Sequence, residues 1–226
     1  MNYCIIGYGK MGKTIERILF QSDDKILTIA DNDIDLRNQI TNIKQCDIAF
    51  EFSTPETAYK NILFCFENNI PVICGTTGWM EKLDEIKKLC IESNQSMIYA
   101  SNFSIGMNIF MQVNKYLSNL MSKFDLYDVS ISETHHIHKK DKPSGTALSL
   151  KNIILEQMQF DDIHIDSFRE GETIGEHTIR YKSNVDNITL THEATNRDAF
   201  AIGAILASKW LIGKKGFFEM SDVINS

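Results

Sequence analysis

The chain has 226 residues, 43% of them hydrophobic, and a formal net charge of -7. This length suits one large or two small domains, each with its own core, and the excess of acidic residues argues against nucleic acid or an anionic membrane as a partner. No apolar run approaches the roughly 18 residues of a membrane span, and the first residues lack the features of a secretory leader, so we expect a cytoplasmic protein. The cysteines lie in apolar runs without C-x-x-C spacing, which predicts buried free thiols.

The N-terminal segment has the pattern of a strand, a tight turn and a helix. The apolar run "YCII" is followed by Gly7, Gly9 and Gly12 in G-x-G-x-x-G spacing, and then by apolar residues at helical intervals. Such glycines permit the turn and the approach of a diphosphate to the helix N-terminus. A second strand, "KILTIAD", ends in Asp31, where a dinucleotide fold holds the adenosine ribose. The pattern predicts dinucleotide binding, and the alternative is a glycine turn that binds nothing.

The alternation of strands and helices continues to about residue 104. We predict strands at "DIAFEFS", "PVICGTTG" and "SMIYASN", with helices at about 55–68 and 80–92 between them. Strands separated by helices of this length form right-handed parallel crossovers, which predicts an α/β domain with a Rossmann-type parallel sheet. "EFSTPET" and "GTTGW" fall at the carboxyl ends of strands, where such sheets bind ligands. Their residues suit a cofactor surface, although Thr54 and Thr57 also suit helix capping.

The pattern changes after "ASNFSIGMN". We predict helices at about 106–121 and 144–157, a strand at "LYDVSISETHH", and then the strands "IHIDSFRE", "EHTIRYKS" and "NITLTHEAT" with no helix between them. This indicates a second, α+β domain built on a mixed or antiparallel sheet. We therefore assign residues 1–104 to a dinucleotide-binding domain and residues 105–196 to a second domain, with a C-terminal helix at about 197–226 that packs back on the first.

The most unusual segment is "SETHHIHKKDKPSGTAL", residues 132–148, in which histidines and lysines precede "PSGT". The latter is typical of a helix start, with Ser144 as its N-cap. The free amides of Gly145 and Thr146, the helix dipole and Lys139 together suit a carboxylate, and the histidines can exchange a proton near neutral pH. The segment predicts a site for an anionic substrate that gains a proton while the first domain supplies a hydride.

Three other interpretations of this segment stay open. "HHIH" could form a metal site, although alternate residues of a strand face opposite ways and the lysines would repel the ion. The segment could also be a solvated basic loop. Finally, histidines are often structural, and we expect that role for His138, His164 and His177.

Several segments resemble, in the same order, those of the dihydrodipicolinate reductase family. They are "GYGKMG", "EFSTPE", "GTTGW", "SNFSIGMN", "ETHHIHKKDKPSGTAL" and "THEATNRDAFAIGAILASKWL". The resemblance spans nearly the whole chain, and the histidine–lysine segment is its most specific part. It implies an oxidoreductase that reduces 4-hydroxy-tetrahydrodipicolinate, a cyclic dicarboxylate, to tetrahydrodipicolinate with loss of water, using NADH or NADPH. The reaction belongs to the diaminopimelate route of lysine biosynthesis.

The resemblance also implies roles for single residues. His135 matches the family's proton donor or acceptor and Lys139 its catalytic lysine, while His136, Gly145 and Thr146 match substrate contacts. The residues that match the cofactor surface are Gly7, Gly9, Lys10, Met11, Gly12, Asp31, Gly75, Thr76, Thr77, Ser101, Asn102, Phe103 and Arg197. No metal is implied. Members commonly form homotetramers through the sheet of the second domain, so we expect a substrate-binding and oligomerisation domain there and a homo-oligomer, either a tetramer or a dimer.

The chain departs from the family in two places. It is short over about 157–176, and Asn32 stands where members often have an arginine. Because Asp31 would also oppose a 2′-phosphate, we expect NADH to be slightly favoured over NADPH. One alternative is another two-domain NAD(P)-dependent dehydrogenase that acts on an amino or imino acid. A second alternative is a nucleotide-sensing regulator, but no basic helix-turn-helix is visible in the sequence.

Overall fold

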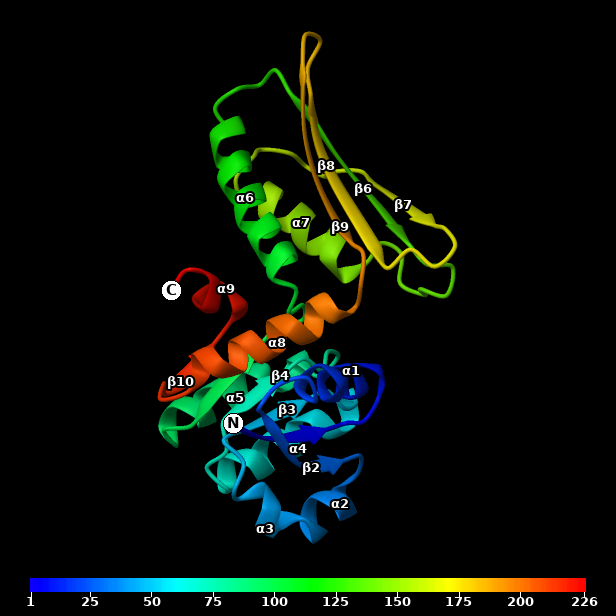
Figure 1. The fold of residues 1–226 in the computed structure, drawn as a ribbon. Helices are drawn as coiled ribbons and strands as arrows, with labels where there is room; N and C mark the ends of the chain where they lie inside the picture. The colour runs from blue at the N-terminus through cyan, green and yellow to red at the C-terminus, as the bar shows by residue number, and fades with distance from the viewer. The chain divides into compact units, whose positions relative to one another are not determined.

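The computed structural model describes residues 1–226, with the side chain of Asp33 excepted. Over these residues the chain forms two compact units, one from Met1–Ile105 and Phe200–Ser226 and the other from Gly106–Ala199 (Figure 1). Within this described part of the chain, no helix is both long enough and apolar enough to cross a membrane.

The first unit is built on a parallel sheet with the strand order β10-β5-β4-β3-β1-β2. Its strands are β1 (Asn2–Ile6), β2 (Lys25–Ala30), β3 (Ile48–Glu51), β4 (Val72–Cys74), β5 (Ser96–Tyr99) and β10 (Gly216–Phe218). Its helices are α1 (Lys10–Leu19), α2 (Asp33–Asn38), α3 (Ile40–Ile43), α4 (Pro55–Glu67), the 3-10 turn η1 (Met80–Lys82), α5 (Leu83–Glu92), most of α8 (Asp198–Leu211) and α9 (Met220–Ile224). This arrangement confirms the predicted Rossmann-type sheet.

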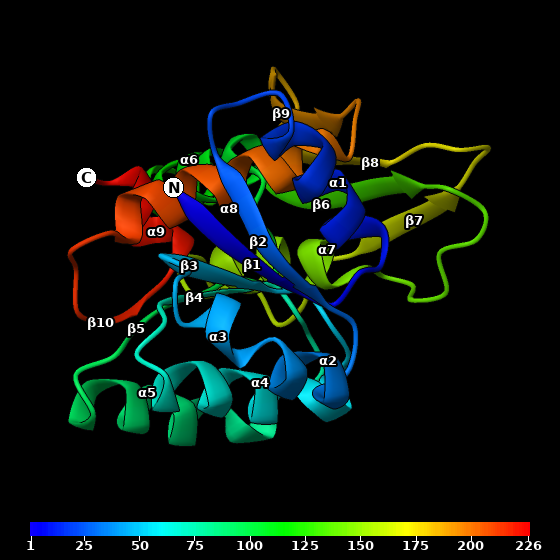
Figure 2. The same ribbon diagram turned by 60° about the horizontal axis from the view of Figure 1, so that its bottom comes forward.

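Helices cover both faces of this sheet. Alternate strand residues point to opposite faces, so that Cys4 and Ala49 pack against the layer of α2, α3, α4 and α5, whereas Ile5 and Phe50 pack against α1 and α8. Figure 2 shows α4 and α5 on one side of the strands and α1 and α8 on the other. Because both faces are buried, the strands are continuously apolar, which is why the sequence showed them as runs rather than as an alternation.

The C-terminal region differs from the single helix expected at about 197–226. Helix α8 ends at Leu211, and residues 216–218 then add strand β10 beside β5, followed by α9. A strand this short leaves too little periodicity to recognise in the sequence. Helix α8 nevertheless packs closely on the first unit, since a Cβ atom at Gly203 would lie 1.8 Å from the carbonyl oxygen of Phe103.

The second unit packs α6 (Ile105–Met121) and α7 (Gly145–Leu155) on one face of a mixed sheet with the order β7-β6-β8-β9. Its strands are β6 (Asp128–His135), β7 (Ile165–Arg169), β8 (Gly175–Lys182) and β9 (Asn187–Ala194). Strands β6 and β7 run parallel, whereas β6–β8 and β8–β9 are antiparallel pairs. This sheet confirms the predicted second α+β unit, and its core includes Ile131, Ile179 and Tyr181.

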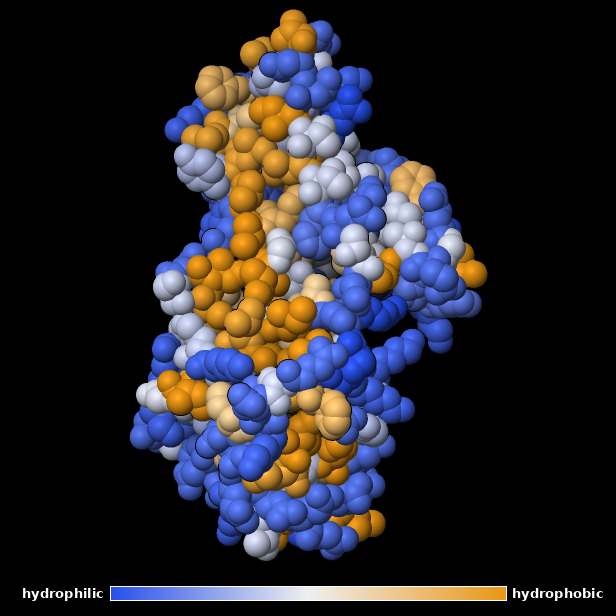
Figure 3. Space-filling model, viewed as in Figure 1, coloured by the Kyte–Doolittle hydropathy of each residue, from blue (hydrophilic) through white to orange (hydrophobic). Residues whose placement is uncertain are grey.

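The outer face of α6 is apolar and exposed. Ile109, Val113 and Leu120 follow one side of the helix at intervals of four and seven residues and are 45%, 42% and 39% exposed. Figure 3 shows hydrophobic side chains gathered over α6 in this view. The unit therefore presents an apolar strip outside its own core.

Candidate active site

The turn between β1 and α1 has the conformation that the glycine spacing predicted. Gly7 has a φ of +91°, and a Cβ there would lie 2.3 Å from the carbonyl oxygen of Phe52. A Cβ at Gly12 would lie 2.3 Å from the carbonyl oxygen of Gly7, whereas nothing lies within 4 Å of a Cβ at Gly9. Gly7 and Gly12 are thus needed for the fold itself. Gly9, the residue that precedes the first turn of α1, instead leaves open space in front of the helix N-terminus.

A cavity of about 440 Å³ lies where this turn meets the ends of β3 and β4. It is lined by Gly9, Lys10, Met11, Phe52, Ser53, Pro55, Gly75, Thr76 and Thr77. The strand order reverses between β1 and β3, because β2 lies on one side of β1 whereas β3, β4 and β5 follow on the other. The crevice at such a switch point is where open α/β sheets bind ligands. The structure therefore brings three of the predicted segments into one cavity, since Phe52, Ser53 and Pro55 belong to "EFSTPET".

The other residues predicted for the cofactor have different surroundings. The Asp31 carboxylate accepts a hydrogen bond of 2.8 Å from the backbone amide of Tyr8, so it braces the glycine turn. Ser101 is exposed, and the Asn102 side chain accepts a bond from the Ser104 amide. Phe103 is 2% exposed and packs on Phe52. Its side chain belongs to the core of the first unit.

A buried carboxylate, Glu51, fixes the residues on one side of the cavity by hydrogen bonds. It is 0% exposed, and its oxygens accept hydrogen bonds from the Asn61 amide at 3.1 Å, from the Cys74 thiol at 3.4 Å and from the Ser53 hydroxyl. The Ser53 amide in turn donates to the Thr76 hydroxyl. The end of β3 is therefore fixed to α4 and to β4, and with it the Ser53 side of the cavity.

The capping role suggested for Thr54 and Thr57 was wrong. Thr54 stands at the N-cap position of α4, but its side chain makes no capping hydrogen bond. Its hydroxyl lies 3.2 Å from that of Thr57 instead. The prediction for the cysteines was right, since Cys4, Cys46, Cys65, Cys74 and Cys90 are all free and buried.

In the second unit, the predicted helix start is confirmed. Ser144 is the N-cap of α7, and its hydroxyl accepts a hydrogen bond of 3.1 Å from the Ala147 amide. Gly145 and Thr146 form the first turn. The Lys139 ammonium lies 2.9 Å from the carboxylate of Asp141, and the Gly145 amide also stabilises that carboxylate. Burial raises the pKa of Asp141, but these partners outweigh it, and the pKa falls below its ordinary value.

A buried cluster that the sequence did not predict lies next to His135. The Glu133 side chain, which is 0% exposed, accepts hydrogen bonds from the Ser144 amide at 3.0 Å and from the Arg169 guanidinium at 3.3 Å. Its other oxygen lies 3.4 Å from His135 Nδ1 and 3.7 Å from His177 Nε2. The His135 and His177 rings meet edge to face, with centroids 5.0 Å apart.

Burial dominates the titration of this cluster. It lowers the pKa of His177 to about 4, with the positive charge of a protonated His135 acting in the same direction and Glu133 against it. Burial also lowers the pKa of His135, opposed by Glu133 and reinforced by Lys139 and Arg169. Burial acts to raise the pKa of Glu133, but hydrogen bonds with Ser144 and Ser167 outweigh it, so this pKa lies below its ordinary value. The carboxylate is therefore ionised and the two histidines are neutral near pH 7.

The remaining histidines divide differently from the prediction. His177 is buried as expected, but His138 and His164 have side chains that are 71% and 77% exposed, so they are not structural core residues. His136 is half-buried, and burial followed by the charge of Arg197 lowers its pKa. Two residues predicted for substrate and cofactor, His136 and Arg197, thus lie near each other within the second unit.

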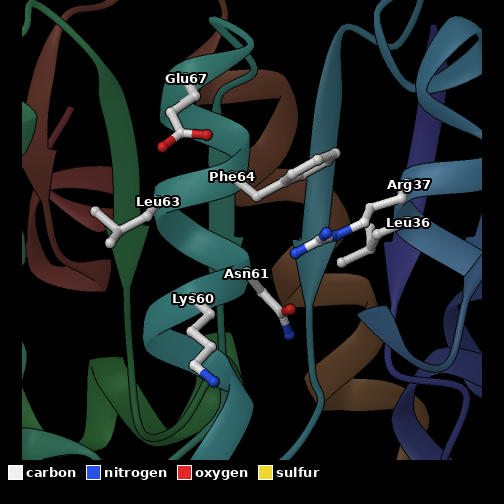
Figure 4. A pocket seen from close by; sticks show the side chains of 7 residues that line it. All are labelled: Leu36, Arg37, Lys60, Asn61, Leu63, Phe64 and Glu67. Atoms are coloured by element: carbon white, nitrogen blue, oxygen red, sulfur yellow. The ribbon is translucent and has the colours of Figure 1, made fainter. Parts of the chain in front are cut away.

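A further pocket of about 250 Å³ lies in the first unit between α2 and α4, away from the predicted residues (Figure 4). It is lined by Leu36, Arg37, Lys60, Asn61, Leu63, Phe64 and Glu67. Figure 4 shows the Arg37 guanidinium extending from α2 toward Asn61 of α4. Because the Asn61 amide already donates to Glu51, this side of the pocket is structural.

The first unit has a parallel sheet with a glycine turn at its switch point and an acid at the end of β2, and the second unit carries a histidine–lysine site. These features define the class of two-domain oxidoreductases that use a nicotinamide cofactor. Residues 1–103 match the family described as "Dihydrodipicolinate reductase, N-terminus", and residues 106–224 match "Dihydrodipicolinate reductase, C-terminus". The chain therefore belongs to the dihydrodipicolinate reductase family and is an NAD(P)H-dependent oxidoreductase.

Curated relatives and solved structures agree with this family. The 4-hydroxy-tetrahydrodipicolinate reductase of Christiangramia forsetii is 42% identical over 236 residues, covering 100% of this chain and 98% of the relative. That of Methanoregula boonei is 30% identical and covers 96% and 94%. The dipicolinate-bound dihydrodipicolinate reductase from Paenisporosarcina sp. TG-14 has the same fold, with a TM-score of 0.80, 24% identity and 97% of both chains covered.

An added methyl group should affect NADH binding at Gly9 but protein stability at Gly12. Gly9→Ala should leave the melting temperature nearly unchanged but weaken NADH binding by roughly tenfold or more, because the Cβ occupies space that a diphosphate would approach. Gly12→Ala, the matched control, should lower the melting temperature because its Cβ meets the Gly7 carbonyl. Fluorescence titration and thermal denaturation measure the two effects, and full NADH affinity in Gly9→Ala would contradict the assignment.

The low pKa of His177 predicts a loss of stability in acid. The unfolded chain binds this proton near pH 6.5 and the folded chain only near pH 4, so the free energy of unfolding should fall as the pH drops between these values. The slope contributed by one such proton reaches about 1.4 kcal/mol per pH unit. Urea unfolding at several pH values should show a shallower dependence in His177→Gln. The exposed His164→Gln should keep the wild-type slope, and an equal slope in both variants would refute the prediction.

Proposed function

We propose that this protein reduces 4-hydroxy-tetrahydrodipicolinate to tetrahydrodipicolinate in the diaminopimelate route of lysine biosynthesis. The curated relatives described above carry the name of this reductase, and they give no support to the alternative of another amino or imino acid dehydrogenase. In the overall change a hydride and a proton enter the substrate, and its hydroxyl group leaves as water. The chain must therefore hold a dicarboxylate and provide a proton.

One observation supports the site most directly. The carboxylate of Asp141 lies 2.9 Å from the Lys139 ammonium, and the Gly145 amide at the start of α7 is among the groups that lower its pKa. A helix N-terminus and an ammonium group attract an anion together. We therefore assign Lys139, Gly145 and Thr146 to a substrate carboxylate and His136, beside Arg197, to a second substrate contact. His135 is assigned the proton transfer.

In this proposal the first unit supplies the cofactor surface except for Arg197, which belongs to the second unit, and the second unit binds substrate. The residues assigned to the cofactor are Gly7, Gly9, Lys10, Met11, Gly12, Asp31, Gly75, Thr76, Thr77, Ser101, Asn102, Phe103 and Arg197. NADH is favoured over NADPH because Asp31 and Asp35 gather at the end of β2, where Asn32 caps α2 and donates to Asp35 at 2.8 Å. A 2′-phosphate there would meet carboxylates in place of a cation.

The proposed assembly is a homo-oligomer in the cytoplasm. The exposed apolar strip of α6, formed by Ile109, Val113 and Leu120, supports contact with a second copy. The face of the second unit's sheet that α6 and α7 do not cover is more polar than this strip. On that face the hydroxyls of Thr178 and Thr191 lie 3.0 Å apart.

The proposed function predicts substrate-dependent oxidation of NADH. Purified protein would be coupled to dihydrodipicolinate synthase with pyruvate and aspartate semialdehyde, which form the substrate in place. The absorbance of the reduced nicotinamide should fall rapidly, and faster with NADH than with NADPH at equal concentration. Tight NADH binding without any turnover would show that the second domain serves another substrate.

Two substitutions separate proton transfer from carboxylate binding. His135→Ala should lower kcat by roughly 10²-fold, the scale of a lost general acid, with NADH affinity unchanged. Lys139→Ala should raise KM and lower kcat together, because the ammonium faces a charge present in the substrate and in the transition state. Lys140→Ala removes the same charge from an exposed neighbour and should behave like the wild type. Comparable kcat values in His135→Ala and the wild type would remove the histidine from the mechanism.

A further inference from the structure

In the buried cluster next to His135, the two carboxylate oxygens of Glu133 have different neighbours. One Glu133 oxygen, Oε1, accepts the hydrogen bonds from Ser144 and Arg169 and so ties β6 to α7 and β7. The other, Oε2, lies 3.4 Å from His135 Nδ1 and 3.7 Å from His177 Nε2. Among the described residues, neither Oε2 nor His135 Nδ1 has a partner that meets hydrogen-bond geometry, and both are buried.

A proton on His135 Nδ1 would give both of these buried atoms a hydrogen-bond partner, because Nδ1 could then donate to Glu133 Oε2. A buried carboxylate oxygen without a donor is costly, and of the two histidine rings the His135 ring is the nearer donor to it. The 3.4 Å separation is slightly long, as catalytic contacts often are before substrate binds. With Nδ1 as the donor to Glu133, the Nε2 atom becomes the one free to exchange a proton. A Cβ at position 175 would lie 3.0 Å from Nε2, so Gly175 leaves room beside that atom.

We propose that Glu133 is a positioning residue for His135, one that holds the proton on Nδ1, fixes the ring and stabilises its doubly protonated form. His177 completes the arrangement as a neutral ring packed against His135, with its Nε2 3.3 Å from the Ser144 hydroxyl. The inference rests on the proposed function, because it assigns how the catalytic histidine of that reaction is oriented. The same logic operates wherever a buried carboxylate orients a histidine that transfers protons.

The charges around His135 show why such a carboxylate is needed. Burial disfavours the imidazolium form, and Lys139 and Arg169 disfavour it further. His177 is a neutral neighbour, and the more distant His192 ring faces His177 from β9. Only Glu133 and Asp141 favour the protonated ring, and of these Glu133 is the larger influence. Without it, His135 would give up its proton at a lower pH.

The same side chains also resemble a metal site in one respect. Glu133, His135 and His177 offer ligand atoms that lie within 4.8 Å of one another. However, Arg169 already donates to the carboxylate, and Lys139 adds a second positive charge nearby. A divalent cation would be repelled by both, whereas a proton shared by Glu133 and His135 satisfies the same atoms. The charge pattern therefore favours the proton.

The test substitutes Glu133→Gln in the full-length protein and records the pH dependence of kcat. Glutamine keeps the size and one acceptor oxygen but removes the charge. If His135 donates a proton, activity falls as the pH rises through its pKa, and this fall should move to lower pH in the variant. We expect kcat near neutral pH to drop by roughly tenfold to a hundredfold, with NADH affinity unchanged. Glu193→Gln, which removes a charge from the exposed β9 position, should leave the profile unchanged.

Glu133→Asp provides the complementary measurement. It retains the charge on a shorter side chain, so its pH profile should stay close to that of the wild type even where kcat is reduced. A lower melting temperature with an unmoved pH profile in Glu133→Gln would show a purely structural role and overturn the proposal.

A readout on the wild-type protein keeps the proposal testable if the variants fail to fold. Nitrogen-15 NMR of the histidine rings should show His135 protonated at Nδ1 in its neutral form, and protonation at Nε2 alone would refute the inference. This result does not depend on turnover, so it separates failure of the inference from failure of the proposed reaction. Metal analysis supplies the last outcome: a stoichiometric ion whose removal abolishes activity would assign the cluster to a metal and overturn the proposal.

Discussion

The enclosed carboxylate of Glu133 is the contact on which the site of the second unit depends. It joins β6 to the start of α7 through the Ser144 amide, to β7 through Arg169 and to β8 through His177. Arg169 also donates to the carbonyl oxygen of Lys139, so the loop that carries the lysine is tied to the same carboxylate. Because these groups share one acceptor, removing it would leave several enclosed donors unsatisfied at once.

The first unit uses a buried carboxylate in a different way. Glu51 stands at the end of β3 and receives neutral donors, namely a hydroxyl, an amide and a thiol. Glu133 receives a guanidinium group and faces two ionisable rings. Neutral donors fix a loop without changing the charge of anything that faces the ligand, which suits a surface where a cofactor only binds. The partners of Glu133 instead couple loop geometry to the protonation of His135, which suits a site where bonds change.

Local signals accounted for most of the fold and for part of the site. The glycine turn at Gly7 and the Ser144 cap could be predicted because each depends on a few adjacent residues and on the conformations those residues allow. Glu133 and His177 could not, because they meet only through the register in which β6 and β8 pair, where they stand directly opposite each other. One signal was nevertheless available. In the predicted strand Glu133 alternates with Ile131 and therefore points into the core, where an acid needs a partner.

The substrate and the proton donor place opposite demands on this unit. A dicarboxylate is attracted by cations, here Lys139 and the N-terminus of α7, but the same cations disfavour a protonated His135. An exposed carboxylate could restore the proton only by repelling the substrate. Glu133 avoids this because its side chain is 0% exposed and lies behind the histidine ring, where its charge acts at 3.4 Å on Nδ1. Burial of the acid thus allows a cationic surface and a proton-donating histidine to coexist.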